Sequence, residues 1–274
     1  DVPRGAAGML FRRVSGGPSH GAPAAIPRCG KPPRNALKPR ARTAQFSRAP
    51  KEEEVGKMVK VTAKDGHQLD AYVAEPKGKP QGGVVIVQEI FGVTGHIQRV
   101  ADQYAAEGFV AIAPAMFDRI KPGITLDYGE IQQGIAYMRA LEWPNTLADV
   151  GAAADYVRDA GGTAVVGFCW GGTVAHVAAS EIDFDAAVSY YGGGVAKMLD
   201  KEPQCAIVYH IGDRDHSIPV ADIDKIKKAY PAATVYVYEG AQHGFNCDER
   251  ASYSAADARL AFARSIELLR EEIL

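Results

Sequence analysis

Alternating strand and helix patterns constrain the fold of this chain more than any other feature of its sequence. Residues 83–87 form a continuous apolar run, which is typical of a strand covered on both faces. Apolar residues then recur at helical spacing over residues 97–105. Further strands are expected at residues 109–113, 163–168, 186–190, 206–211 and 234–238, with helical segments between them. This order predicts an α/β fold with a mostly parallel central sheet and helices on both faces.

The sequence also predicts the elements at the two ends of this alternating strand and helix pattern. Residues 59–63 and 69–73 flank Asp65-Gly66, a dipeptide that favours a tight turn, and predict an antiparallel N-terminal hairpin. At the other end, one face of a predicted helix carries Phe262, Ile266, Leu269 and Ile273. Because neither a repeat nor an interior linker interrupts the pattern, we expect one domain over residues 58–274.

Residues 1–57 differ from the rest in composition. This segment contains twelve Lys or Arg and four acidic residues. Its basic residues alternate with Pro, Gly and Ala, and it shows no hydrophobic periodicity. We expect a disordered basic leader. It resembles either an organelle transit peptide or an extension that is not native to the folded protein, so the expected location is the cytoplasm, or an organelle if the leader is a transit peptide.

Charge and cysteine content exclude several classes of protein. The whole chain has a net charge of -2, so residues 58–274 are acidic and would repel nucleic acid. No apolar run approaches the roughly 18 residues that span a bilayer. The cysteines form no CxxC pair, which argues against zinc or a disulfide framework: they are Cys29, Cys169, Cys205 and Cys247. We expect a monomer with no metal, no cofactor, and neither nucleic acid nor a membrane as partner.

The motif around Cys169 is the sharpest chemical signal. Residues 165–172 run from an apolar strand through Gly-Phe-Cys-Trp-Gly into a helix, the pattern of a nucleophile elbow with cysteine in place of serine. Side chains at positions 167 and 171 would clash with the neighbouring helix and strand. The positive end of the helix favours a thiolate, and the Trp170 backbone N–H is placed to stabilise an oxyanion. The alternative is an inert cysteine beside a tight turn.

Chain order supplies a candidate acid and a candidate base. In this kind of fold the nucleophile is followed by an acid and then a histidine, each after a later strand. Asp215 follows the strand at 206–211, and His243 follows the strand at 234–238. Asp213 is the competing acid, with a helix cap or a turn as its other role. His216 precedes the last strand, so His243 is the better base.

Five motifs resemble one known family. They are Gln88-Glu89-Ile90-Phe91-Gly92, residues 167–172, Ser189-Tyr190-Tyr191-Gly192, residues 210–216 and His243-Gly244-Phe245. In this order they are similar to the dienelactone hydrolase, or carboxymethylenebutenolidase, family of the α/β-hydrolase superfamily, over about residues 58–274.

The resemblance implies roles for individual residues. The catalytic triad would be Cys169 as nucleophile, His243 as general base and acid, and Asp215 as the orienting carboxylate. Glu89 would pair with the resting thiol and let it ionise when substrate arrives. The backbone amides of Ile90 and Trp170 would form the oxyanion hole.

Substrate-binding residues follow from the same resemblance. Arg119 would clamp a substrate carboxylate, and Tyr190 or Tyr191 would line the pocket. The chain departs from the family at Cys247, where well-known members carry a second arginine. Arg250 is either a replacement that reaches the same place or a surface arginine.

The expected reaction is hydrolysis of a small lactone or ester, of the dienelactone-to-maleylacetate type found in aromatic degradation, through an enzyme thioester. A broad carboxylesterase or thioesterase of the same fold is the alternative. Amides are poor candidates because a thiolate expels poor leaving groups badly. From other classes, a non-catalytic binding protein or a thiol sensor would keep the fold without this chemistry.

Overall fold

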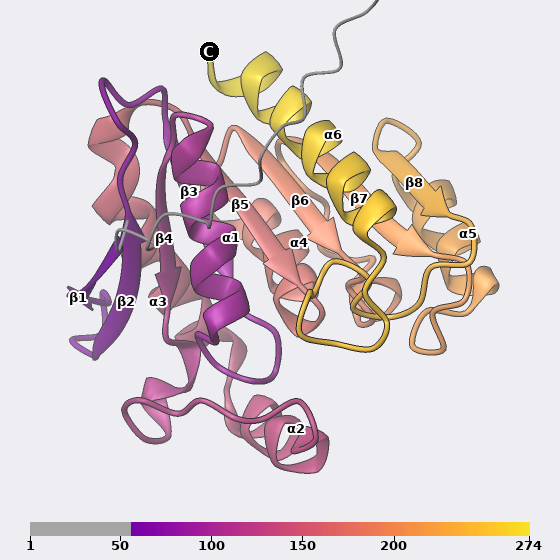
Figure 1. Cartoon of the computed structure of the whole chain (residues 1–274), viewed down its shortest axis with the longest axis horizontal. Coiled ribbons are helices and arrows are strands. Elements are labelled where there is room, and N and C mark those ends of the chain that lie inside the picture. The colour runs from indigo at the N-terminus through magenta and orange to yellow at the C-terminus, as the bar shows by residue number, and fades with distance from the viewer. Residues whose placement is uncertain (1–55) are drawn as a thin grey trace, which may run out of the picture. The chain divides into compact units, whose positions relative to one another are not determined.

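The computed structural model describes residues 56–274, and the predicted leader over residues 1–57 lies outside the described residues except for its last two positions. The described chain forms an eight-stranded sheet in the order β1-β2-β4-β3-β5-β6-β7-β8 (Figure 1). The strands are β1 (Gly56–Thr62), β2 (Gln68–Ala74), β3 (Gly83–Val87), β4 (Val110–Pro114), β5 (Thr163–Phe168), β6 (Ala186–Tyr190), β7 (Ala206–Gly212) and β8 (Thr234–Tyr238).

The sheet is antiparallel at its N-terminal edge and parallel elsewhere. β1 pairs with β2, and β2 with β4, in antiparallel register. The pairs from β4 through β8 are parallel. The predicted turn closes through a hydrogen bond from the Gly66 N–H to the Ala63 carbonyl at 2.8 Å, with Gly66 at φ +87°. The predicted mixed sheet with an N-terminal hairpin is confirmed.

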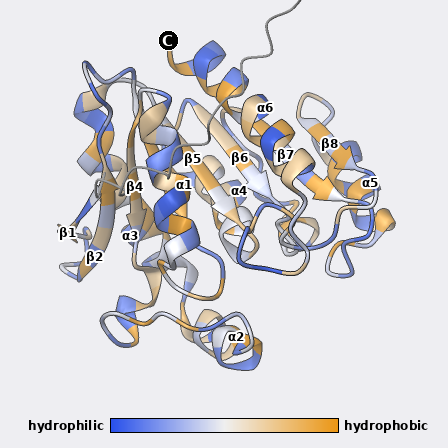
Figure 2. Cartoon of the chain, in the orientation of Figure 1, coloured by the Kyte–Doolittle hydropathy of each residue, from blue (hydrophilic) through white to orange (hydrophobic). Residues whose placement is uncertain are grey.

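Helices cover both faces of this sheet. Figure 1 shows α1 and α6 on the face toward the viewer, with α3 and α4 behind it. Every residue of β3, β5 and β6 is buried, as expected for strands between two helical layers. Figure 2 shows hydrophobic residues along the strands and a mixture of both kinds on the covering helices. The helices are α1 (Gly95–Ala106), α2 (Ile131–Ala140), α3 (Trp143–Val157), α4 (Trp170–Glu181), α5 (Val220–Ala229) and α6 (Ala255–Ile273).

The carboxyl ends of the parallel strands meet at one edge of the sheet. Phe168 at the end of β5 is in register with Tyr190 at the end of β6, and Gly212 of β7 with Tyr238 of β8. The loops that follow these strands therefore converge. In open α/β sheets, ligand sites form at this edge.

The segment between β4 and β5 leaves the sheet and returns. The sequence predicted one helical region ending near residue 159, whereas the structure has α2, α3 and short 3₁₀ turns. Figure 1 shows α2 beyond the carboxyl ends of β5 and β6. Only Gly134 of α2 is buried. Among residues 56–274, no helix is both long enough and apolar enough to cross a membrane.

Candidate active site

Cys169 occupies a strained turn between β5 and α4. Its φ is +55°, a region that residues other than glycine rarely adopt. Its backbone N–H donates to the Tyr190 carbonyl at 3.0 Å, which ties the turn to the end of β6. A non-glycine residue held at positive φ between a strand and a helix is the geometry of a nucleophile elbow.

The glycines around Cys169 allow three backbone segments to approach closely. A Cβ at Gly167 would overlap the carbonyl oxygen of Gly171 at the start of α4, and one at Gly171 would overlap that of Val87 in β3. The predicted clash of side chains at these two positions is confirmed. A Cβ at Gly172 would lie 2.6 Å from the oxygen of Tyr190.

The three residues predicted as a triad lie in contact. His243 Nε2 is 3.1 Å from Cys169 Sγ, and His243 Nδ1 is 2.8 Å from Asp215 Oδ2. The other carboxylate oxygen of Asp215 accepts the Ser217 N–H at 2.8 Å, which fixes the carboxylate plane. Asp213, the alternative acid, accepts the Gly240 N–H at 2.7 Å as a turn residue.

Neighbouring charges control the protonation of His243. Burial alone would lower the pKa of His243, but negative charge on Cys169 and Asp215 and the hydrogen bonds to both raise that pKa to about 10. At neutral pH the imidazole therefore carries a proton beside the sulfur. A protonated imidazole beside a cysteine sulfur is the arrangement that activates cysteine nucleophiles.

The residues that carry the candidate oxyanion donors line the same cavity as Cys169. Ile90 lies just after β3, and Trp170 is the first residue of α4. Among the described residues, neither the Ile90 N–H nor the Trp170 N–H donates to a backbone carbonyl of a loop, a turn or a neighbouring element. Trp170 is the first residue of α4, and the first N–H of a helix has no partner within the helix. The Ile90 loop is held by α2, where a Cβ on Gly134 would overlap the Ile90 carbonyl oxygen.

Glu89 lies buried in an ion pair with Arg250. Its side chain is 1% exposed, and its Oε1 accepts from Arg250 Nη1 at 3.3 Å. Its Oε2 has no hydrogen-bond partner among the described residues. The family resemblance predicts that Glu89 pairs with the resting thiol, whereas Cys169 Sγ bonds to His243 in this structure. Arg250 packs over the ring of Phe91 at 5.9 Å and lines the cavity, so it is not a surface arginine.

Arg119 does not reach the cavity. Its guanidinium makes two hydrogen bonds of 2.7 Å to Asp149 and lies 2.8 Å from Asp65. Asp149 is 1% exposed, so the pair neutralises a buried carboxylate beneath the β1–β2 turn. The structure thus contradicts the expected role of Arg119 as a clamp for a substrate carboxylate, because Asp149 and Asp65 already occupy the N–H donors of its guanidinium group.

The two candidate tyrosines pack behind the triad and do not line the cavity. The Tyr190 hydroxyl hydrogen-bonds to Ser265 at 2.8 Å in the core. The Tyr191 ring packs edge-on against His243 at 5.2 Å, and its buried hydroxyl has no partner among the described residues. Tyr191 therefore supports the imidazole, and neither side chain is in the expected place.

A cavity of about 640 Å³ opens above the sulfur. Its lining includes Cys169, His243, Ile90, Trp170 and Arg250. The remaining walls come mainly from α2, the start of α3 and the loop after β6. These wall residues are not among the candidates from the sequence, although apolar side chains at helical spacing over residues 131–138 indicate one face of a helix there.

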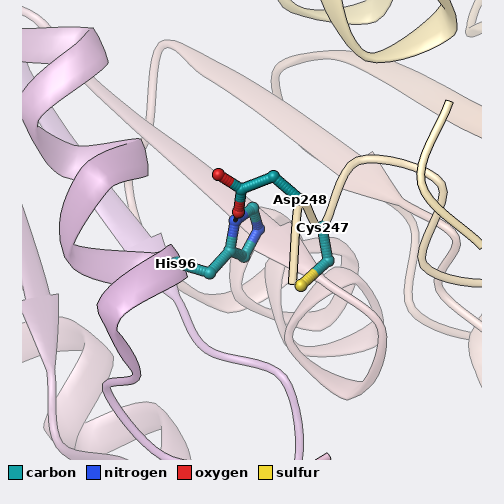
Figure 3. Close-up of side chains that lie close together, drawn as sticks. All are labelled: His96, Cys247 and Asp248. Carbon is teal, nitrogen blue, oxygen red and sulfur yellow. Dashed lines mark hydrogen bonds and ion pairs between the residues drawn. The ribbon is translucent and has the colours of Figure 1, made fainter. Parts of the chain in front are cut away.

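One other cluster has the residue types of a metal site. Donor atoms of His96, Cys247 and Asp248 lie within 4.8 Å of one another (Figure 3). Asp248 Oδ1 already pairs with His96 Nδ1 at 3.1 Å and with Arg99 at 2.8 Å, and this cationic guanidinium opposes a metal ion. Burial raises the pKa of the Cys247 thiol to about 12, so it stays neutral. These contacts join the loop after His243 to α1.

Comparisons with known proteins agree with this geometry. The sequence model of the dienelactone hydrolase family matches residues 69–273. The chain is 35% identical over 230 residues to a putative carboxymethylenebutenolidase of Synechocystis, covering 75% of this chain and 93% of that protein. It is 32% identical over 223 residues to carboxymethylenebutenolidase of Pseudomonas putida, covering 77% and 94%. A putative dienelactone hydrolase structure from Klebsiella pneumoniae superposes with a TM-score of 0.71 and 27% identity over 79% of this chain and 98% of that chain. The expected α/β-hydrolase fold is thereby confirmed.

Proposed function

The chain belongs to the dienelactone hydrolase family, and on this premise we propose that it hydrolyses a lactone or an activated ester through Cys169, His243 and Asp215. Its family and its relatives show that it is a hydrolase of ester or lactone bonds. The observation that carries the finer proposal is the continuous relay of 3.1 Å from Cys169 to His243 and 2.8 Å from His243 to Asp215.

The first chemical step forms a thioester. The Cys169 thiolate attacks the carbonyl carbon, and the carbonyl π electrons move to oxygen, where the amides of Ile90 and Trp170 donate hydrogen bonds. Collapse of this intermediate breaks the bond to the ester oxygen. The leaving oxygen takes the proton from the His243 imidazolium, which leaves a neutral imidazole.

The second step hydrolyses the thioester. Once Cys169 is acylated its negative charge is gone, and with it the main factor that raises the pKa of His243. The neutral imidazole can then accept a proton from water as the water oxygen attacks the acyl carbon. Expulsion of the thiolate restores the ion pair and releases a carboxylic acid, which ionises in solution.

Glu89 and Arg250 complete this proposal. In this proposal His243 already holds the thiol proton, so Glu89 does not need to accept it, and its buried carboxylate instead positions Arg250. Arg250 is one of the cationic side chains that line the cavity, and it is the one nearest in sequence to the missing second arginine of the family. Arg119 cannot bind a substrate carboxylate there, because it is engaged with Asp149.

A panel of substrates with a nucleophile variant tests the proposal. Cys169→Ala should reduce kcat for dienelactone and for aryl esters by at least about 10²-fold to 10³-fold. Mass spectrometry of the wild type quenched during turnover should show an acyl adduct on Cys169. Full activity of Cys169→Ala, or an adduct on a different residue, would refute the assignment.

A broad carboxylesterase or thioesterase is the second candidate. It is favoured by the cavity volume and by Cys247, which replaces a second family arginine with a neutral side chain. Dienelactone and neutral aryl esters compared at equal concentration separate the two. A kcat/KM that is higher for dienelactone supports the lactonase, and the reverse supports the esterase.

A further inference from the structure

The cavity extends well beyond the atoms that react. The chemistry requires only that one carbonyl lie near Cys169, Ile90 and Trp170. The volume of about 640 Å³ lies within the range of roughly 300–1,000 Å³ typical of sites that hold drug-sized ligands. Most of this space is therefore available to parts of a substrate other than the bond that is cleaved.

An apolar wall faces this space from α2. Ile131, Ile135 and Met138 are spaced by four and three residues, which places them on one side of the helix. All three line the cavity. Ile131 is still 43% exposed, so the protein leaves part of this side of α2 uncovered. An apolar substrate body would cover it and would gain from leaving water.

The charged side chains at the cavity have one sign. Arg139 of α2 and Lys197 of the loop after β6 line it together with Arg250, and no Asp or Glu is among its lining residues in the described chain. Arg250 is compensated by Glu89. Within residues 56–274, Arg139 and Lys197 form no ion pair with a carboxylate. Uncompensated cations in a concave site raise the local concentration of anions.

We propose that the natural substrates are esters with a bulky apolar body and an anionic group, larger than a simple dienelactone. The ester carbonyl lies at Cys169, the apolar body lies against Ile135 and Met138, and the anion lies near Arg139 and Lys197. This inference rests on the proposed function, because it assumes that the ester bond is cleaved at Cys169.

Four esters that share one leaving group distinguish the effect of the size of the acyl group from the effect of its charge. They are the 4-nitrophenyl monoesters of acetic, succinic, 4-phenylbutanoic and benzylsuccinic acids, which are small or bulky and neutral or anionic. We expect the highest kcat/KM for the benzylsuccinate monoester. If the succinate monoester or the acetate ester is hydrolysed equally well or better, the proposal is overturned while the proposed function stands.

Matched variants assign the effect to the wall and to the cations. In Arg139→Met with Lys197→Met, the ratio of kcat/KM for the anionic to the neutral bulky ester should fall by about tenfold. Lys227→Met with Lys228→Met on α5 removes the same charge from an exposed site and should keep the ratio. Ile135→Gln should lower the ratio of bulky to small esters by about tenfold, and Leu260→Gln on α6 should not. Unchanged ratios in both cavity variants overturn the proposal.

A binding measurement tests the proposed substrate class without relying on hydrolysis. Calorimetry with Cys169→Ala compares benzylsuccinate with succinate. At least about tenfold tighter binding of benzylsuccinate supports the substrate class even if no ester is hydrolysed, in which case the proposed function alone fails. Equal affinities overturn the substrate class even if all four esters are hydrolysed.

Discussion

The backbone of Gly134 lies against the carbonyl oxygen of Ile90, so closely that a Cβ at position 134 would overlap that oxygen. The contact joins α2, which forms the apolar wall of the cavity, to the loop that carries a candidate oxyanion donor. Alanine in a helix is about 1 kcal/mol more favourable than glycine, so this glycine is explained by the close approach.

Gly134→Ala should therefore impair catalysis rather than folding. A Cβ would displace the Ile90 loop or α2, and we expect kcat/KM for a 4-nitrophenyl ester to fall by up to about 10²-fold, as when an oxyanion donor is lost. Gly151→Ala in α3 is the matched control, because a Cβ there meets nothing within 4 Å. Equal activity of the two variants would contradict this role for the contact.

Removal of Arg119 should affect stability and leave hydrolysis intact. Arg119→Met would leave the buried carboxylate of Asp149 without its cationic partner, and the free energy of unfolding should fall by about 3 kcal/mol. Arg158→Met, which breaks a pair exposed on both sides, should change it by less than about 1 kcal/mol. Urea unfolding measures both, and a loss of kcat/KM without a loss of stability in Arg119→Met would restore the clamp role.

The titration of His243 should depend on Cys169. Burial lowers the pKa of His243, and the charge and hydrogen bonds of Cys169 and Asp215 raise it to about 10, so the imidazolium should persist through neutral pH and lose its proton only near pH 10. In Cys169→Ala the thiolate is absent, and the pKa should fall. NMR of the His243 ring protons follows both titrations. Identical midpoints would show that no thiolate faces the ring.

His210 should make the protein sensitive to acid. Burial, with a smaller effect of Arg264, lowers the pKa of this imidazole from 6.5 to about 3. Between these values the unfolded chain binds a proton that the folded chain does not, so stability falls as pH drops, by up to about 1.4 kcal/mol per pH unit. The stability of His210→Gln should depend less on pH from 6.5 to 3, whereas exposed His216→Gln should keep the wild-type slope. Urea unfolding at several pH values checks this, and equal slopes for His210→Gln and the wild type would contradict it.

The sequence predicts the sheet well because its strands are buried on both faces. The runs at residues 83–87, 163–168, 186–190 and 234–238 coincide with β3, β5, β6 and β8. The sequence does not separate α2 from α3. The apolar residues of α2 recur at helical spacing but face a cavity instead of the core, so the sequence predicts a helix there without showing that it leaves the sheet.

The sequence predicts the positions of the loops at the site better than the directions of its long side chains. The turn at Cys169 and the loops at Asp215 and His243 follow from strand order, and the structure brings these three side chains together. The direction of a long side chain does not follow from strand order. Arg119 turns toward Asp149, which is 30 residues away in the sequence, and Arg250 turns into the cavity. Neither orientation has a local signal.

The protonation of the cysteines makes the protein suited to selective alkylation. Burial, with nearby acidic groups, raises the pKa of Cys205 and of Cys247 to about 12, so both thiols are poor nucleophiles at neutral pH. Cys169 instead bonds to a protonated imidazole and opens to a cavity with uncompensated cations. Among the cysteines of residues 56–274, a negatively charged reagent such as iodoacetate should therefore modify Cys169 first. An aromatic haloacetate that carries its own carboxylate would serve as an activity-directed label for this enzyme in a mixture.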